Sequence, residues 1–334
     1  MTSPTVLVVG AGISGLACAR ALRDAGATVR VVDRGRAPGG RMSGRRVDGR
    51  AIDLGASYFT AEPDSRFEAV VHDWLARGLA REWTDTFRTA GPDGIRDSRS
   101  GPMRFASPTG LRDLVIDLAE GLDVVAGETV EEVTPATGDT ASVSVSFTGS
   151  TGAEGFDHVV LAMPDPQARR LLAPGSRALD VLHGADGWHP TIAVALTFAE
   201  HEWASDLHGA FVNDSPKLSF VADDGDRRGD GAPVLVAHSS AELAHAHLDD
   251  PDGAIAPITE AVSRMLALTA APVDAFAHRW TFARPAAPHD DPFLLDDRVG
   301  VCGDAWGGKA SVAAAWTSGD ALGRAIARAS AFPG

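Results

Sequence analysis

The sequence contains little cysteine and no excess of positive charge. Its 334 residues include two cysteines, and 45 acidic against 30 basic residues give a formal net charge of −15. So few cysteines exclude a disulfide-rich scaffold. The acidic balance argues against nucleic acid as a partner, because backbone phosphates require a basic protein face.

Long hydrophobic runs are also missing. No stretch reaches the roughly 18 consecutive apolar residues that a membrane-spanning helix needs. The chain passes from Met1 directly into the apolar residues 6–9, without the basic segment or cleavage site typical of export. We therefore expect a soluble, cytoplasmic protein without a membrane partner, whose hydrophobic content of 44% suffices for a sizeable core.

Metal-ligand patterns are sparse as well. Cys18 and Cys302 each stand among small apolar residues and are interpreted as buried thiols. His245 and His247 are close in sequence, but no further ligands at suitable spacing complete a site, so no metal is expected. The acidic residues 223–226 lack the spacing of a calcium loop and are interpreted as an exposed turn.

What is present begins with a strand–helix–strand pattern. Residues 5–10 form a short apolar run typical of a parallel strand buried on both faces. Residues 13–25 carry apolar side chains at helical spacing and end at Gly26, and residues 28–33 form the next strand. This is a βαβ unit, whose crossover is expected to be right-handed.

The turn between the first strand and the helix is rich in glycine. Gly10 permits a tight turn, Gly12 lets the backbone approach a pyrophosphate, and Gly15 lets helix and strand pack closely. Asp33 ends the second strand, 18 residues after Gly15, where its carboxylate can accept hydrogen bonds from ribose hydroxyls. The pattern predicts a dinucleotide cofactor but does not separate NAD from FAD.

Two later motifs favour FAD over NAD. Arg41 follows Gly39 and Gly40, and its guanidinium can pair with the pyrophosphate while the glycines let the chain pass beside the cofactor. Residues 52–59 then form a strand that breaks at a Gly-Ala-Ser turn, which can bring backbone against a flat ring system. An NAD-dependent dehydrogenase would leave these residues and the C-terminal motif unexplained.

The C-terminal motif combines an acidic residue with the N-terminus of a helix. Gly303 and Asp304 end a short strand, and the Asp304 carboxylate can accept from ribityl hydroxyls. The final helix follows, and the positive end of its dipole suits the negative charge that collects at N1–C2=O of a reduced flavin. Elsewhere we predict strands over residues 124–125, 130–133, 142–147, 156–163, 191–198, 234–237, 276–282 and 298–302, and helices over 255–268 and 313–329.

The segments GxGxxG…D, GGR, DLGASYFT, FDHVVLAMP, HRWTFARP and VCGDAWGGKASVAAAW resemble, in content and order, the flavin-containing amine oxidase superfamily. The chain looks most similar to the short bacterial renalase-like branch, and the resemblance covers nearly the whole chain. It implies an α/β fold with a discontinuous, GR2-like Rossmann-type FAD-binding domain (residues 1–60, 105–165 and 290–334). An inserted α+β substrate domain is expected over residues 61–104 and 166–289.

The resemblance also implies non-covalent FAD and a set of residues that contact it. These are Gly10, Gly12, Ser14, Gly15, Asp33, Arg34, Gly40, Arg41, Gly55, Ala56, Ser57, Val130, Gly303, Asp304 and Val312. Two departures stand out: Ala313 occupies the position of a glutamate common in the family, and Cys302 lies inside a strand, where it cannot tether the cofactor. No catalytic side chain is implied, and Tyr58 and Trp280 are candidates for the substrate cavity.

The expected chemistry is removal of a hydride from a C–H bond next to nitrogen, with small-molecule substrate and O2 as the partners and hydrogen peroxide as a product. Renalase-like proteins suggest reduced dihydropyridine nicotinamides as substrates. A small amine is the alternative within the same class. A biosynthetic FAD-dependent desaturase or isomerase without oxidase turnover is the alternative from another class. The sequence leaves the substrate, the electron acceptor and the oligomeric state open.

Overall fold

The computed structural model describes residues 3–136, 142–296 and 298–329. Contacts divide the chain into two compact units. The first unit comprises Met1–Arg41, Val115–Trp188 and Arg284–Gly334, and the second comprises Met42–Leu114 and His189–Ala283.

The first unit is built on a six-stranded sheet with the order β17-β18-β11-β1-β2-β7. All neighbouring pairs from β18 to β7 are parallel, and β17 adds an antiparallel edge. The parallel strands confirm the βαβ unit predicted from the apolar runs and the Rossmann-type α/β fold that the family resemblance implies. The strands are β1 (Thr5–Val9), β2 (Thr28–Asp33), β7 (Asp123–Ala126), β11 (His158–Ala162), β17 (Leu294–Asp296) and β18 (Val299–Cys302).

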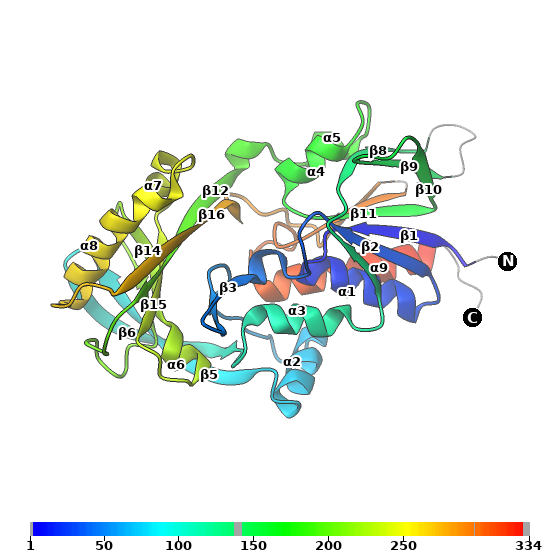
Figure 1. Ribbon diagram of the computed structural model, residues 1–334. Coiled ribbons are helices and arrows are strands. Elements are labelled where there is room, and N and C mark those ends of the chain that lie inside the picture. The colour runs from blue at the N-terminus through cyan, green and yellow to red at the C-terminus, as the bar shows by residue number, and fades with distance from the viewer. Residues whose placement is uncertain (1–2, 137–141, 297, 330–334) are drawn as a thin grey trace. The chain divides into compact units, whose positions relative to one another are not determined.

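Two long helices of this unit pack backbone against backbone. In Figure 1, α1 (Ile13–Asp24) and α9 (Val312–Ala329) lie side by side. A Cβ placed on Gly319 would lie 1.9 Å from the Ser14 carbonyl oxygen, and one on Gly323 would lie 2.6 Å from that of Cys18. Glycine at these two positions therefore lets the C-terminal helix fix the position of α1.

A smaller antiparallel sheet completes the first unit. Its order is β10-β9-β8, and β8 also forms a parallel bridge from Val133 to Leu172, just after α4. Its elements and neighbours are β8 (Val130–Thr134), β9 (Val143–Phe147), β10 (Ala153–Phe156), α4 (Asp165–Leu171), α5 (Ala178–Val181) and the 3-10 turn Ala185–Gly187.

The second unit contains a seven-stranded sheet with the order β16-β12-β15-β14-β13-β5-β6. One of its faces is covered by α8 (Ile255–Leu266), whose Ile258, Val262 and Met265 join a core with Leu218 and Val221 of the sheet. The strands are β5 (Arg81–Gly91), β6 (Gly94–Ala106), β12 (Trp188–Thr197), β13 (Gly209–Val212), β14 (Leu218–Asp223), β15 (Val234–Ser239) and β16 (Asp274–Pro285).

The remaining elements include a hairpin and short helices. The hairpin pairs β3 with β4, and α3 begins in the second unit and ends in the first. These elements are the 3-10 turn Gly40–Met42, β3 (Gly44–Val47), β4 (Arg50–Asp53), α2 (Arg66–Ala76), α3 (Leu111–Ala119), α6 (Asp224–Arg228), α7 (Ala241–Ala246) and the 3-10 turn Pro251–Ala254.

The observed division differs from the predicted domain boundaries. Residues 42–60 and 105–114 belong to the second unit, and residues 166–188 and 284–289 belong to the first. The reason for the first difference is burial, because Ile52 and Leu54 share a core with Ala193 and Val236 of the seven-stranded sheet. Residues 166–188 stay with the first unit, in which α4 lies beside β8. In the part of the chain described here, no helix is long and apolar enough to cross a bilayer.

Candidate functional site

The glycine-rich turn of the first unit forms a bare backbone cradle. Gly10 has a φ of +112°, and a Cβ there would lie 2.5 Å from the Ala162 carbonyl oxygen. A Cβ on Gly15 would lie 2.0 Å from the Gly10 carbonyl oxygen. The fold therefore requires glycine at positions 10 and 15, because any side chain there would clash with the backbone.

Gly12 differs, because the protein leaves space beside it. A Cβ there would meet only the Cα of Gly40, at 3.9 Å. Gly12 caps the N-terminus of α1 without a side-chain cap, and the first turn of the helix carries no acidic residue. The helix dipole and its free N–H groups are thus available to an anion, and a side chain at Gly12 would be excluded by a ligand rather than by the fold.

Asp33 is held at the edge of this cradle by two backbone donors. Its Oδ2 accepts from the Ala11 N–H at 2.7 Å, and its Oδ1 accepts from the Gly35 N–H at 2.7 Å. A carboxylate has about four lone-pair sites, so both oxygens can still accept from a diol. The Glu128 N–H bonds to the Asp33 carbonyl oxygen, which brings the segment before Val130 to the same strand end. Val130 is buried there, whereas Arg34 is exposed.

Two predicted cofactor residues, far apart in sequence, pair with each other. The Arg41 guanidinium donates to Asp304 through Nη1 at 2.8 Å and Nη2 at 2.5 Å. The Arg41 Cζ also lies 5.4 Å from the centre of the Trp188 ring. Both side chains are partly exposed, so a bound ligand could replace the hydrogen bonds between Arg41 and Asp304 with bonds to itself. Next to it, the Gly303 N–H donates to the Ser318 hydroxyl of α9 at 3.2 Å.

The C-terminal helix starts with a serine cap. Ser311 Oγ accepts from the Ala314 N–H at 3.0 Å, and no acidic side chain occupies the first turn that Val312 opens. Cys302 is fully buried, and burial raises the pKa of its thiol to about 12. Such a thiol carries almost no thiolate at neutral pH, which agrees with a cofactor held without a covalent bond.

In the second unit, side chains from distant segments donate hydrogen bonds to the backbone at both ends of the Gly55–Ser57 turn. The indole Nε1 of Trp280 donates to the Leu54 carbonyl oxygen at 2.8 Å. Nη1 of Arg227 donates to the Ser57 carbonyl oxygen at 2.9 Å. Asp53, immediately before the turn, accepts from the Leu111 N–H and from Arg228 Nη2 at 2.9 Å. Sequence reasoning placed Trp280 in a cavity, and the structure shows it as a donor to this turn.

Arg227 and Arg228 belong to a buried charge cluster that corrects the expectation of an exposed turn at residues 223–226. Asp224 is 0% exposed and pairs with both arginines, and Arg50 Nη1 also reaches its Oδ2 at 2.6 Å. Burial lowers the pKa of Arg227 to about 10, so its charge persists at neutral pH. The interpretation was wrong because burial here depends on Asp53, far away in sequence. The spacing of Asp224 from the two arginines, three and four residues on one short helix, was the available signal.

Tyr58 continues from the anchored turn into an aromatic cluster. Its ring centre lies 5.3 Å from that of Phe87, 6.3 Å from that of Phe220 and 6.4 Å from that of Trp83. The Arg104 Cζ lies 5.6 Å from the Tyr58 ring centre. The turn is therefore followed directly by a largely buried aromatic cluster that contacts one guanidinium.

A further cluster in the first unit escaped sequence reasoning. Asp165, His183 and His289 offer ligand atoms within 4.8 Å of one another, and His289 Nε2 lies 2.8 Å from Asp165 Oδ2. The His289 ring stacks between those of His183 and Trp306. These residues share no sequence spacing, so no motif could have indicated them.

Comparisons with known proteins agree with these features. Residues 8–74 match the NAD(P)-binding Rossmann-like domain family, and residues 90–326 match the flavin containing amine oxidoreductase family. Polyamine oxidase 1 of Oryza sativa subsp. japonica is 34% identical over 130 residues, which are 38% of this chain and 22% of that protein. Probable polyamine oxidase 4 of Arabidopsis thaliana is 36% identical over 92 residues, 28% and 17% of the two chains. The chain thus matches only about a fifth of the length of these curated relatives.

Solved structures share the fold over almost the whole chain. A putative protoporphyrinogen oxidase from Exiguobacterium sp. 255-15 superposes with a TM-score of 0.77 at 16% identity, covering 98% of this chain and 100% of the other. Wild-type putrescine oxidase bound to putrescine gives 0.72 at 17% identity, covering 99% and 100%. Since the amine oxidoreductase match spans more than half of the chain, the protein belongs to the flavin-containing amine oxidoreductase family.

Proposed function

We propose that this flavoenzyme removes a hydride from a C–H bond next to nitrogen, with a reduced dihydropyridine nicotinamide as substrate, as in renalase-like proteins, and O2 as the acceptor. The substrate leaves with two electrons fewer, and O2 with two protons becomes hydrogen peroxide. FAD, when bound, supplies the hydride acceptor, and the protein supplies binding, orientation and exclusion of water.

The cradle of the first unit supports a role in holding FAD. In this proposal the α1 N-terminus at Gly12, with Ser14 and Gly15, receives the pyrophosphate, and Asp33 accepts the ribose hydroxyls. The remaining contacts come from the family resemblance, which assigns them to Gly10, Arg34, Gly40, Arg41, Gly55, Ala56, Ser57, Val130, Gly303, Asp304 and Val312.

The observation that carries the hydride mechanism is the anchored turn with the apolar cluster that follows it. Trp280 and Arg227 hold the backbone on either side of Gly55 and Ala56, so that the turn cannot shift when a ring system lies against it. The ring of Tyr58 packs on a core formed with Phe87 and Phe220. Hydride transfer needs alignment and exclusion of water rather than a strong base, and an anchored turn beside an apolar cluster supports such a role.

Two other functions are supported by separate observations. The two plant relatives are polyamine oxidases by name, which favours a small amine as the substrate. The likeness to a putative protoporphyrinogen oxidase keeps a biosynthetic desaturation or isomerisation open. An oxidase produces hydrogen peroxide in step with substrate loss, whereas an isomerase leaves both O2 and the substrate's oxidation state unchanged.

Anaerobic stopped-flow mixing tests the proposal. Holoenzyme is mixed with isomers of reduced nicotinamide mononucleotide and, separately, with putrescine, and bleaching of the flavin absorbance is followed. We expect bleaching by a dihydropyridine isomer and peroxide formation once air is admitted. Bleaching by putrescine alone would replace the proposal with amine oxidation, and bleaching by neither would overturn both.

A further inference from the structure

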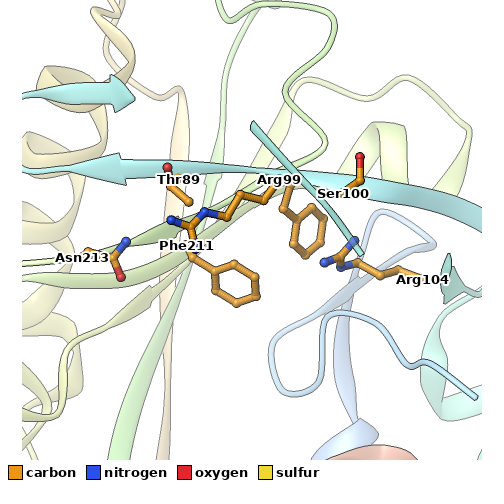
Figure 2. A pocket seen from close by; sticks show the side chains of 7 residues that line it. Thr89, Arg99, Ser100, Arg104, Phe211 and Asn213 are labelled. Carbon is orange, nitrogen blue, oxygen red and sulfur yellow. The ribbon is translucent and has the colours of Figure 1, made fainter. Parts of the chain in front are cut away.

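The sheet of the second unit carries a pocket of about 360 Å³ that the cofactor residues do not account for. It lies at the end of the sheet formed by β5, β6 and β13 (Figure 2). Its lining comprises Phe87, Thr89, Arg99, Ser100, Arg104, Phe211 and Asn213, all from this unit. A volume of this size accommodates a small organic molecule or a group of a larger one.

The charge of this pocket is opposite to that of the protein. Two of its lining residues are arginines, and none of the lining residues, all of which are described, is acidic. The chain as a whole has a formal net charge of −15. A cationic recess in an acidic protein concentrates anionic ligands and repels cationic ones.

Arg104 is a fixed donor inside the pocket. It is 8% exposed, its Cζ lies 4.0 Å from the centre of the Phe87 ring, and its Nη1 donates to the Asp85 carbonyl oxygen at 2.7 Å. Its Nε is buried without a hydrogen-bond partner. The Phe87 ring and the Asp85 carbonyl oxygen hold this guanidinium in place, so that its charge stays beside the pocket.

Arg99 supplies the second guanidinium, from the exposed side. Among the residues that the structure describes, no carboxylate forms an ion pair with Arg99 or Arg104. Of the other arginines of this hairpin, Arg88 pairs with Asp206 and Arg96 with Asp214. Arg81 donates to backbone carbonyl oxygens of α6 and lies outside the pocket. Arg99 and Arg104 therefore bring two charges that no described carboxylate neutralises into the pocket.

The rest of the lining suits a flat apolar body with polar edges. Phe211 is 40% exposed, an unusual state for a large aromatic side chain, and its ring centre lies 5.5 Å from that of Phe87. In Figure 2, the Phe211 ring lies between the guanidinium groups of Arg99 and Arg104, and the Asn213 amide stands on the Arg99 side. Aromatic faces flanked by guanidinium groups can hold a planar group and its attached anion together.

We infer that this pocket binds an anionic group, a carboxylate or a phosphate, of a substrate with a planar apolar body. The inference rests on the proposed function in one respect, that the bound compound is the substrate. The link lies within the second unit, because Arg104 and Phe87 both contact Tyr58, the residue after the Gly55–Ser57 turn. Polyamines, as polycations, are then not substrates of this enzyme.

Binding and turnover are measured separately, so that the anion-binding pocket and the proposed substrate can each be refuted without the other. Calorimetric titration of the holoenzyme compares benzoate and phenyl phosphate with benzylamine and benzyl alcohol, which share the ring but differ in charge. We expect the two anions to bind at least about tenfold more tightly than benzylamine, as loss of one charge-assisted hydrogen bond implies. Their affinity should fall as salt increases. Equal or tighter binding of benzylamine would overturn the inference whatever the flavin does.

Variants locate the binding in this pocket. Arg99→Gln, at an exposed position, should weaken phenyl phosphate binding about tenfold, and Arg99→Glu should shift the preference toward benzylamine. Arg104→Lys retains the charge and should lose about tenfold because an ammonium cannot reproduce the forked donor. Arg96→Gln removes the same charge from the same strand outside the pocket and serves as the control. Unchanged affinity in Arg99→Gln and Arg99→Glu would show that the anions bind elsewhere.

In the turnover arm, reduced nicotinamide mononucleotide is compared with the riboside that lacks its phosphate. We expect the nucleotide to have the lower KM by about tenfold, and Arg99→Gln to remove most of that difference. Anion binding without reduction of the flavin by either compound would leave the pocket assignment intact and refute the proposed substrate. Faster turnover of putrescine than of the nucleotide would refute the inferred substrate class.

Discussion

The Nη1 atom of Arg227 lies 2.9 Å from the carbonyl oxygen of Ser57, although 170 residues separate the two in sequence. The same guanidinium contacts Asp224 and lies 3.5 Å from Asp53 through Nη2. All four residues are less than about a tenth exposed. The turn proposed to face the flavin ring is thus tied to a charged cluster, and not merely to apolar neighbours.

The first prediction concerns this cluster. Arg227→Met should lower the free energy of unfolding by about 3 kcal/mol, because removing one partner leaves buried carboxylates undercompensated. Arg227→Lys keeps the charge but cannot serve Asp224 and Ser57 together, so we expect a smaller loss of stability and a clear loss of FAD retention. Thermal denaturation and the flavin absorbance per chain after desalting measure the two effects.

A matched control distinguishes the cluster from surface charge. Arg264 forms an exposed pair with Glu260 on α8, and Arg264→Met should leave the free energy of unfolding nearly unchanged, because exposed ion pairs contribute little. If Arg227→Met were as mild as this control, or if Arg227→Lys kept full FAD retention, the positioning role would be refuted.

The second prediction separates two roles of glycine in one turn. Gly12→Ala should leave the stability of the apoprotein nearly unchanged, since its Cβ would meet nothing closer than 3.9 Å. It should nevertheless weaken FAD binding strongly, because the methyl group occupies space required for close approach of the pyrophosphate. Gly15→Ala should prevent folding, as its Cβ would lie 2.0 Å from a carbonyl oxygen.

Fluorescence titration of apoprotein with FAD and denaturant unfolding give the two readouts. Gly152→Ala, with no atom within 4 Å of the added Cβ, is the control and should change neither. Normal FAD affinity in Gly12→Ala would mean that the pyrophosphate does not lie against this residue.

The sequence alone was informative where the relevant interactions are local. The strand of residues 28–33 and the positions of Gly10 and Gly15 follow from apolar runs and steric demands within a short segment, and the parallel pairing of β1 with β2 and β11 confirms that reasoning. The family match over residues 90–326 confirms the expectation of a flavoprotein, whereas the contacts expected from Arg41 and residues 52–59 stay predictions.

The second unit was harder to predict because its stability depends on contacts between distant segments. β6 is exposed at most positions and carries charged residues on both faces, so the hairpin of β5 with β6 gave no alternating pattern. The burial of Asp224 and Arg227 was equally hard to predict, because this hydrophilic stretch is buried through ion pairs with the distant residues Arg50 and Asp53. Ion pairs between distant segments produce no periodic pattern in a sequence.

The third prediction addresses the pair formed by Arg41 and Asp304. Asp304→Asn removes the charge but keeps the shape, and it should weaken FAD binding about tenfold or more if this carboxylate accepts from ribityl hydroxyls. Because both side chains are partly exposed, the loss in apoprotein stability should stay below about 1 kcal/mol.

The double variant Arg41→Lys/Asp304→Asn tests whether the two residues act together. Coupling is expected, so the combined loss of FAD affinity should be smaller than the product of the two single effects. Losses of FAD affinity that simply multiply would show that the two residues act independently. A large loss of stability without a change in FAD affinity would show that the pair is structural.

The last prediction concerns acid stability. Burial, assisted by the charge of Arg227, lowers the pKa of His238 to about 4, below the ordinary value of 6.5. The unfolded chain therefore takes up this proton first as the pH falls. His238 contributes no penalty above about pH 6.5, and stability is lost progressively as the pH falls from about 6.5 to about 4. His238→Gln should flatten that part of the curve of melting temperature against pH, whereas His245→Gln, at an exposed position, should not. A curve for His238→Gln parallel to that of the unaltered protein would show that His238 does not sense acid.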